Sequence, residues 1–177
     1  MNPDAPEHEL PRSSIVKTLR SSVSALDRVS YWIIVVAMLA MTTLVVLQVF
    51  FRYALSSSID SADELARLFF VWSIFLAIPH GIRYGIHVGI DLFVMFLPVR
   101  LKGLFFILTA AASALLMALV FWFGLISMIS KWDQYMPTLP ISAGLFYCAV
   151  SISGAHSFLH SLLLTIGGSN VWGDETL

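Results

Sequence analysis

Charged residues are scarce in this chain, and their scarcity excludes an ordinary soluble domain. Only 12% of its 177 residues are Asp, Glu, Lys or Arg, whereas soluble domains carry about 25%. The net charge of −1 gives no reason to expect nucleic acid or another polyanion as a partner. The single cysteine, Cys148, cannot form an intrachain disulfide, and no Cys/His spacing typical of a zinc site is present.

Motifs for catalysis and for solute binding are also missing. There is no G-x-x-x-x-G-K-[ST] loop to bind ATP, and no serine–histidine–acid or paired-carboxylate arrangement indicates an enzyme. None of the apolar runs is broken midway by a Gly/Pro pair, and no inverted repeat of the transporter kind is visible. The sequence therefore predicts a non-enzymatic chain with no catalytic, substrate-binding or metal site and no cofactor.

Four long apolar runs stand out instead. The first, residues 29–51, holds no charge; as a helix it covers roughly 35 Å, enough to cross a bilayer core of about 30 Å. The other runs are residues 62–83, 101–130 and 140–167. We expect a polar cytoplasmic arm at 1–28, where Pro3, Pro6 and Pro11 argue against helix and no cleavable signal is visible, a membrane domain at 29–167 and a polar tail at 168–177.

Residues 84–97 form an apolar segment too short to cross, and Pro98 ends it. The segment carries His87 and Asp91, which favours a helix lying in the membrane interface. The predicted fold is thus an all-α integral membrane protein with four transmembrane helices and an interfacial helix between spans two and three.

The distribution of basic residues predicts the orientation. The N-terminal arm and the second loop together hold seven Lys and Arg, whereas the first and third loops hold three. Because basic residues accumulate on the cytoplasmic side, both termini should face the cytoplasm.

Three charges gather where the first two spans should meet the outer face. Arg52 ends span one, where a cation suits the helix dipole. Ser61 and Glu64 have the spacing of a capping box at the start of span two, and Arg67 follows one turn later. We expect Arg52 and Glu64 to approach each other across the short loop, supported by Arg67.

A second polar group lies near the end of span two. His80, Arg83, His87 and Asp91 share one helical face if the helix continues past Gly85. They either form an ion or proton site, because ionisable groups at membrane depth are costly, or an interfacial seam whose charges reach water. Glycines at positions 81, 85 and 89 either allow a close helix approach or mark a bend.

His156 and His160 lie four residues apart on the last span and so share a face. They could ligate a metal, act as a proton site, or, with His80 on span two, hold a b-type haem between two helices. Alternatively both are neutral and hydrogen-bonded to a neighbouring helix, with Ser153 and Ser157 close by. The spacing alone leaves these readings open.

Several short stretches, taken in order, resemble one known family. They are Phe51-Arg52-Tyr53, Glu64-Leu65-Ala66-Arg67-Leu68-Phe69-Phe70-Val71-Trp72, His87-Val88-Gly89-Ile90-Asp91-Leu92, Leu97-Pro98, and Pro137-Thr138-Leu139 with Tyr147. The chain is similar over roughly residues 27–160 to the small membrane subunit of tripartite ATP-independent periplasmic (TRAP) transporters. The resemblance rests on the order and spacing of these elements with four spans.

This resemblance implies a function and partners. The chain would be a non-catalytic scaffold in the bacterial inner membrane, bound to a large multi-span permease subunit that holds the solute and ion sites. A periplasmic solute-binding protein would deliver an organic acid, and an ion gradient, usually of sodium, would drive import. Arg52, Glu64, Arg67, Arg83, His87 and Asp91 are the candidate subunit-interface or structural polar residues. The alternative is a membrane redox subunit that binds b-type haem.

Overall fold

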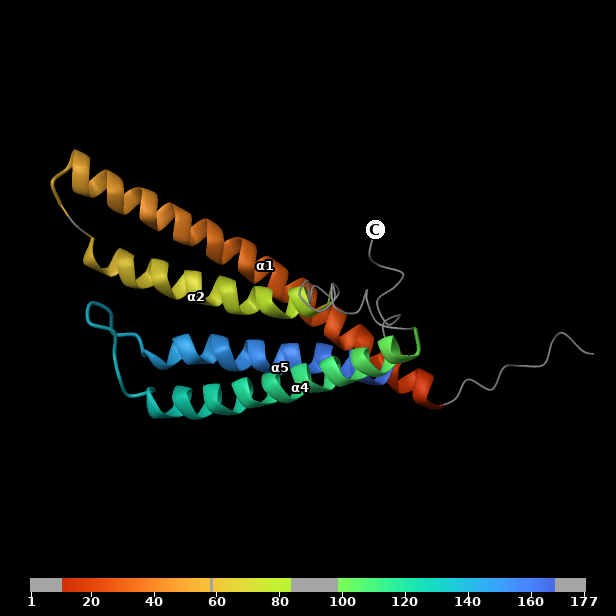
Figure 1. The fold of residues 1–177 in the computed structure, drawn as a ribbon. Helices are drawn as coiled ribbons and strands as arrows, with labels where there is room; N and C mark the ends of the chain where they lie inside the picture. Colours follow the sequence, from red (N-terminus) through yellow and green to blue (C-terminus); the bar gives the residue numbers. More distant parts are fainter. Residues whose placement is uncertain (1–10, 58, 84–98, 168–177) are drawn as a thin grey trace, which may run out of the picture.

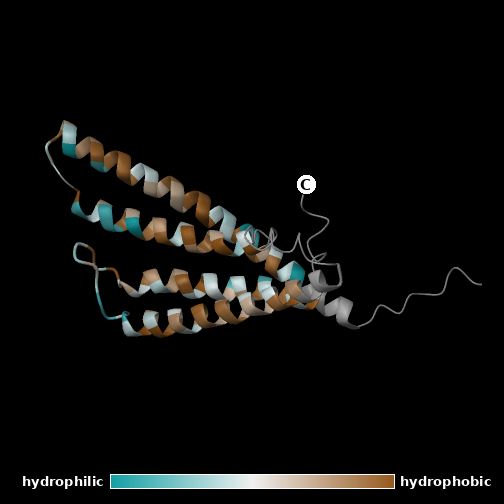
Figure 2. Cartoon of the chain, viewed as in Figure 1, coloured by the Kyte–Doolittle hydropathy of each residue, from teal (hydrophilic) through white to brown (hydrophobic). Residues whose placement is uncertain are grey.

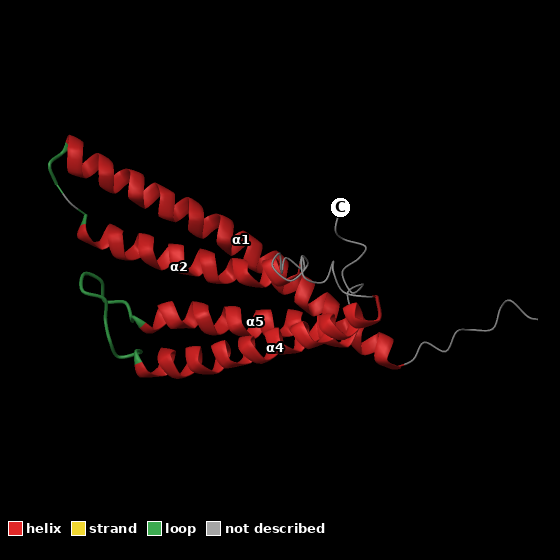
Figure 3. Ribbon diagram, viewed as in Figure 1, coloured by secondary structure: helices red, strands yellow, loops and turns green. Residues whose placement is uncertain are grey.

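Four long helices make up the described part of the chain. The computed structural model describes residues 11–57, 59–83 and 99–167. Its helices are α1 (Pro11–Ala54), α2 (Asp60–Arg83), α4 (Val99–Ser130) and α5 (Gly144–Gly167) (Figure 1). All four are long and apolar enough to cross a membrane. Figure 3 shows helices and loops, and no strand, in the described ranges. The predicted all-α membrane fold with four spans is confirmed.

Helix α1 begins well before the predicted first span. It starts at Pro11 and runs unbroken to Ala54, so residues 11–28 are helical and continue span one instead of forming an irregular arm. Pro11 is compatible with this start because the first helical residue has no intrahelical partner for its N–H and proline already has a helical φ. The longer helix places Asp27 inside the first candidate span, Leu19–Ala54.

Two other expected boundaries also move. Helix α2 starts at Asp60, and the Glu64 carboxylate bonds to the α4–α5 loop, so the predicted capping box at Ser61 is wrong. Helix α5 starts at Gly144 and not at Pro140, because the preceding loop folds back on itself through a bridge between Tyr135 and Ser142. The interfacial helix predicted for 84–97 lies outside the described residues.

The four helices pack as two pairs joined through α5. Helix α4 packs most extensively on α5 and α1 on α2, α2 packs against α5, and α1 contacts α5 least. The α1–α2 and α4–α5 loops lie at one end of the bundle, so the start of α1 and the end of α5 lie together at the other (Figure 1). Most of the α5 span, 56%, is buried, against 6% of the α1 span. Helix α5 is therefore central, and α1 is peripheral.

The solvent that suits this surface is lipid. Apolar residues cover the helices along most of their length, while polar residues gather toward the ends (Figure 2). Hydroxyl groups inside the spans donate to carbonyls four residues earlier, as Thr42 does to Met38 and Ser73 to Phe69. Such bonds satisfy the hydroxyls within their own helix, where no water is present to do so.

Glycine allows α4 and α5 to approach each other closely. A Cβ added at Gly154 would lie 2.7 Å from the backbone nitrogen of Phe121 and 3.0 Å from its Cα. Small residues let membrane helices approach in this way. Gly81, by contrast, has nothing within 4 Å of such a Cβ, so it makes no close helix contact within the described chain; Gly85 and Gly89 lie outside the described residues.

Alanine substitutions at Gly154 and Gly81 should have different effects on stability. Gly154→Ala forces the Phe121 backbone away and should destabilise the α4–α5 pair by about 1–3 kcal/mol. Gly81→Ala should leave stability unchanged or raise it by about 0.5–1 kcal/mol, because alanine is the better helix former. Thermal unfolding of the purified variants in detergent measures both. Equal stability of Gly154→Ala and the unmodified chain would show that the close contact is not formed.

Candidate functional site

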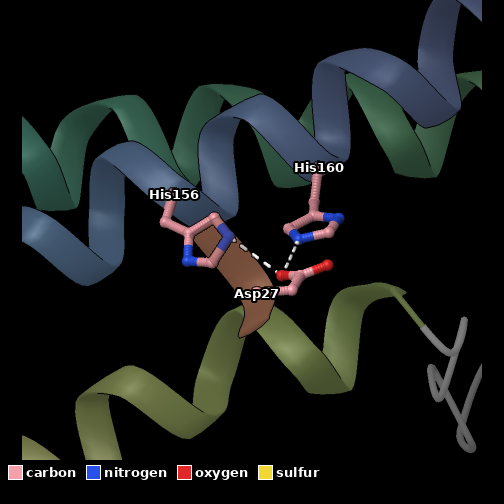
Figure 4. A group of neighbouring side chains, drawn as sticks. All are labelled: Asp27, His156 and His160. Carbon is pink, nitrogen blue, oxygen red and sulfur yellow. Dashed lines mark hydrogen bonds and ion pairs between the residues drawn. The ribbon is translucent and has the colours of Figure 1, made fainter. Parts of the chain in front are cut away.

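A buried polar cluster joins three helices at the end of the bundle away from the two loops. It consists of Asp27 and Ser30 on α1, His80 on α2, and His156 and His160 on α5. The carboxylate of Asp27 faces both α5 imidazoles (Figure 4). Nε2 of His160 lies 2.8 Å, and Nε2 of His156 3.0 Å, from the same oxygen, Oδ1. One carboxylate oxygen thus connects two imidazoles to a helix far away in sequence.

The two imidazoles contact this oxygen differently. His160 makes a hydrogen bond to Asp27 Oδ1. His156 approaches the same oxygen, yet its Nε2 has no aligned hydrogen bond within the described chain and is buried. Its 3.0 Å separation is short enough for an ion pair if the ring is protonated. The arrangement therefore leaves one ring nitrogen directed at the carboxylate without the geometry of an ordinary hydrogen bond.

Local helical periodicity explains how each side chain is positioned. His156 and His160 are four residues apart on α5, and Asp27 and Ser30 are three apart on α1, so each pair occupies one face. The Ser30 hydroxyl donates to the Asp27 carbonyl at 3.0 Å. It lies 2.9 Å from His80 Nε2, so the imidazole donates to the hydroxyl oxygen when its hydrogen is on Nε2.

Burial makes these contacts energetically important. Asp27 is 3% exposed, His156 6% and His160 0%. A carboxylate removed from water is costly unless charged or hydrogen-bonding partners replace the lost hydration. The two imidazoles supply that replacement, and they can do so as neutral donors, as an imidazolium, or as co-ligands of a cation. Asp27, His156 and His160 each offer one ligand atom, and these three atoms lie within 4.8 Å of one another, the spacing of a possible metal ligand set.

The two α5 histidines share one face, as the sequence predicted. Their partner, Asp27, is a residue that the sequence analysis missed. Asp27 was assigned to the polar arm because it precedes the uncharged run. The three-residue spacing between Asp27 and Ser30 could have revealed it, because this spacing places Asp27 on the same helical face as Ser30 if span one begins before residue 29. Among the readings left open, a haem between His80 and His160 gains no support, because each ring is already engaged with another side chain.

The outer-face charges are arranged differently from the prediction. The Glu64 carboxylate accepts hydrogen bonds from Thr138 in the α4–α5 loop, at 2.6 Å from the hydroxyl and 3.1–3.2 Å from the backbone N–H. Arg52 in the last turn of α1 and Arg67 on α2 are both exposed. This contact joins α2 to the α4–α5 loop, and the expected Arg52–Glu64 approach is not among the contacts seen in the described chain.

The remaining predicted polar residues are only partly visible. Arg83 is the last residue of α2, and its side chain lies outside what the structure describes, as do His87 and Asp91. Of the predicted stripe, only His80 can be placed, and it faces Ser30 on α1. Whether the other three share its face stays a prediction.

Fold and site together define a small multi-pass membrane protein whose buried polar residues join its own helices. The family described as tripartite ATP-independent periplasmic transporters, DctQ component, matches residues 41–169. The chain belongs to this family. It is therefore a component of a transporter and a multi-pass protein of the inner membrane, as the resemblance implied.

Individual relatives agree with this assignment. A TRAP transporter small permease protein of Haemophilus influenzae is 27% identical over 135 residues, which cover 75% of this chain and 81% of the relative. The C4-dicarboxylate TRAP transporter small permease protein DctQ of Vibrio cholerae is 28% identical over 63% of this chain and 45% of its own length. The isethionate TRAP transporter permease protein DctMQ of Oleidesulfovibrio alaskensis is 28% identical over 68% of this chain and 20% of its own length.

A double-mutant cycle should detect the contact between α2 and the α4–α5 loop. Glu64→Gln and Thr138→Val should each lower the unfolding free energy, and together they should lose less than the sum because they break one interaction. The coupling should be about 1 kcal/mol, since the bond is charge-assisted but exposed. Asp63→Asn, an exposed acid one residue away, is the matched control and should have little effect on thermal unfolding. Strictly additive losses would show that the contact contributes nothing.

Proposed function

We propose that the chain is the non-catalytic scaffold subunit of a secondary transporter that imports an organic acid, driven by an ion gradient with sodium as the coupling ion. The observation that carries this proposal is the combination of DctQ family membership with a bundle whose buried charges are engaged with its own helices. A scaffold needs stable spans and an outer surface for partners, and the described residues supply both.

The outer surface supports an assembly role. The spans of α1 and α4 are only 6% and 11% buried within the chain, whereas that of α5 is 56% buried. Large apolar side chains stand exposed along both peripheral helices, including Trp32 and Leu39 on α1 and Leu115 and Trp122 on α4. Lipid can cover these faces, and so can the apolar helices of a large permease subunit, which is the partner we propose.

The relatives support that partner and the solute class. One relative is named a permease protein DctMQ, and this chain aligns with only 20% of it, which leaves most of that protein for a larger permease part. The names of two relatives specify C4-dicarboxylate and isethionate, and both are organic anions. We infer an organic acid as the solute, bound by the large permease and delivered by a periplasmic solute-binding protein.

Two grooves between the helices suit lipid better than an anion. One groove of about 450 Å³ between α1, α2 and α5 is lined by apolar and aromatic side chains, among them Trp32 and Trp72. Another, of about 470 Å³, is apolar except for Ser30, Cys148, Ser151 and His156. Neither offers the lysine or arginine that would neutralise a carboxylate. A third groove, of about 410 Å³, is lined by Arg20 and Arg28, but all of its lining residues lie on α1 alone. We infer that the cations that bind the solute belong to the large subunit.

Helix arrangement supports an orientation with both termini in the cytoplasm. The basic N-terminal part of α1, with Arg20 and Arg28, lies at the same end of the bundle as the end of α2 and the start of α4 (Figure 1). These are the segments that carry most of the basic residues, and such residues accumulate on the cytoplasmic side. The Glu64–Thr138 end then faces the periplasm, where a solute-binding protein would dock.

Reconstitution tests the scaffold role. The purified chain alone in liposomes should transport nothing. The chain together with its large permease subunit and solute receptor should take up a C4-dicarboxylate or isethionate when an inward sodium gradient is applied, and uptake should stop when sodium is replaced by potassium. Uptake of a radiolabelled solute is the measurement. Transport by this chain alone would falsify the scaffold proposal.

Cysteine labelling tests the orientation. In a Cys148→Ala background, Ser57→Cys should react with an impermeant thiol reagent in intact spheroplasts, because the α1–α2 loop faces outward. Ser169→Cys should react only after the membrane is opened. The reverse pattern would place both termini in the periplasm.

A further inference from the structure

We propose that Asp27, His156 and His160 form a binding site for a divalent transition metal ion of the zinc class, which cross-links α1 to α5. The proposal departs from the sequence prediction of no metal site, and it does not depend on the transport function proposed above. Its ligand atoms are Oδ1 of Asp27 and Nε2 of both histidines, which the fold brings from two helices to one point (Figure 4).

The distances between these atoms are close to those of a coordination site. The two nitrogens lie 2.8 and 3.0 Å from Oδ1. Zinc bonds of about 2.0–2.1 Å in a tetrahedron place neighbouring ligands about 3.3 Å apart. The two nitrogen–oxygen separations therefore need to open by about 0.3–0.5 Å to match this geometry. Helix α5 fixes the two imidazoles relative to each other, so only the carboxylate has to be positioned by a second element.

The orientation of His156 is an independent argument for a cation. Its Nε2 is buried and directed at Asp27 Oδ1, yet it makes no aligned hydrogen bond within the described chain. A buried ring nitrogen without a hydrogen-bond partner is unfavourable. A metal ion between the three atoms would use the lone pair of that nitrogen. Each imidazole would then carry its hydrogen on Nδ1, and the metal would replace the hydrogen at Nε2.

The ligand chemistry selects the class of ion. Two imidazoles and one carboxylate suit zinc and its neighbours among the first-row transition metals. Magnesium and calcium prefer oxygen ligands throughout, so they should bind here poorly. Three protein ligands leave one tetrahedral position for a water molecule. His80 does not fill that position in the structure, because its Nε2 contacts Ser30 and its ring centroid lies 6.4 Å from that of His156.

Burial and packing explain what such an ion would do. Asp27 is 3% exposed, so the attraction of a divalent cation to its carboxylate is weakly screened. The α1–α5 contact is the least extensive of the principal helix contacts. A metal ion at this point would attach the peripheral α1 to the central α5 by bonds instead of by packing area. It would thereby fix the part of α1 that precedes the apolar run relative to α5.

The test uses the full chain purified in detergent with an affinity tag that lacks histidine. After a wash with chelator, the protein is equilibrated with zinc or magnesium, passed through a desalting column, and analysed for bound metal by plasma mass spectrometry. We expect about one zinc per chain and no retained magnesium. Cobalt in place of zinc should give the intense visible absorption of a tetrahedral site.

Matched variants locate the ion. His156→Gln, His160→Gln and Asp27→Asn should each weaken zinc binding about tenfold or more, since loss even of a supporting residue costs about 10–100-fold. The double change His8→Gln with His87→Gln, which alters the two histidines that are not assigned to the cluster, should keep full binding. Circular dichroism confirms that each variant is helical.

Two results would overturn the proposal. One is a folded, chelator-washed chain that retains no zinc and gives no tetrahedral cobalt spectrum, which would make the cluster a hydrogen-bonded ion pair alone. The other is unchanged binding by His156→Gln or His160→Gln, which would place the ion elsewhere. If the variants fail to fold, the zinc-dependent rise in melting temperature of the unmodified chain, reversed by chelator, decides between the outcomes.

Discussion

The carboxylate of Asp27, buried in a membrane-spanning helix, constrains much of this structure. Lipid cannot hydrate a charge, so the protein must supply partners for it. It does so with two imidazoles on α5 that reach one carboxylate oxygen at 2.8 and 3.0 Å. Because both imidazoles are on the central helix α5, α1 must lie close to α5 at Asp27. No other described polar contact requires α1 to approach α5. Ser30 and His80 add a second link, from α1 to α2.

Polar contacts at the two ends of the bundle leave the middle to apolar packing. At the opposite end, Glu64 on α2 bonds to Thr138 in the α4–α5 loop. Between the ends, Gly154 lets α5 lie directly on the backbone of α4 at Phe121. The described helices are therefore held by a few directional polar contacts and by close approach of α4 and α5 at glycine. Its peripheral faces, above all on α1, stay available to lipid and to a larger subunit.

The positions of the four helices were easier to predict from the sequence than the residues of the polar cluster. Span positions followed from run length and from the bilayer thickness. All four helices end within three residues of the expected points, and three of the four also begin within four residues of them. The start of α1 was misjudged, because proline was taken as a breaker although it is well tolerated at the first helical position. The capping box at Ser61 was inferred from spacing alone, yet the carboxylate of Glu64 found a better partner 74 residues away.

The sequence by itself determined that this chain is a four-helix membrane protein, that His156 and His160 share a face, and that its motifs resemble one transporter family. These properties are local, because they depend on residue composition and on the 3.6-residue period of a helix. Only the tertiary structure decided what the histidines face. Asp27 lies 133 residues from His160, and no periodicity connects positions on different helices. The packing of α1 against α5 brings the Asp27 carboxylate to the two imidazoles. These polar groups would be unfavourable in lipid without partners.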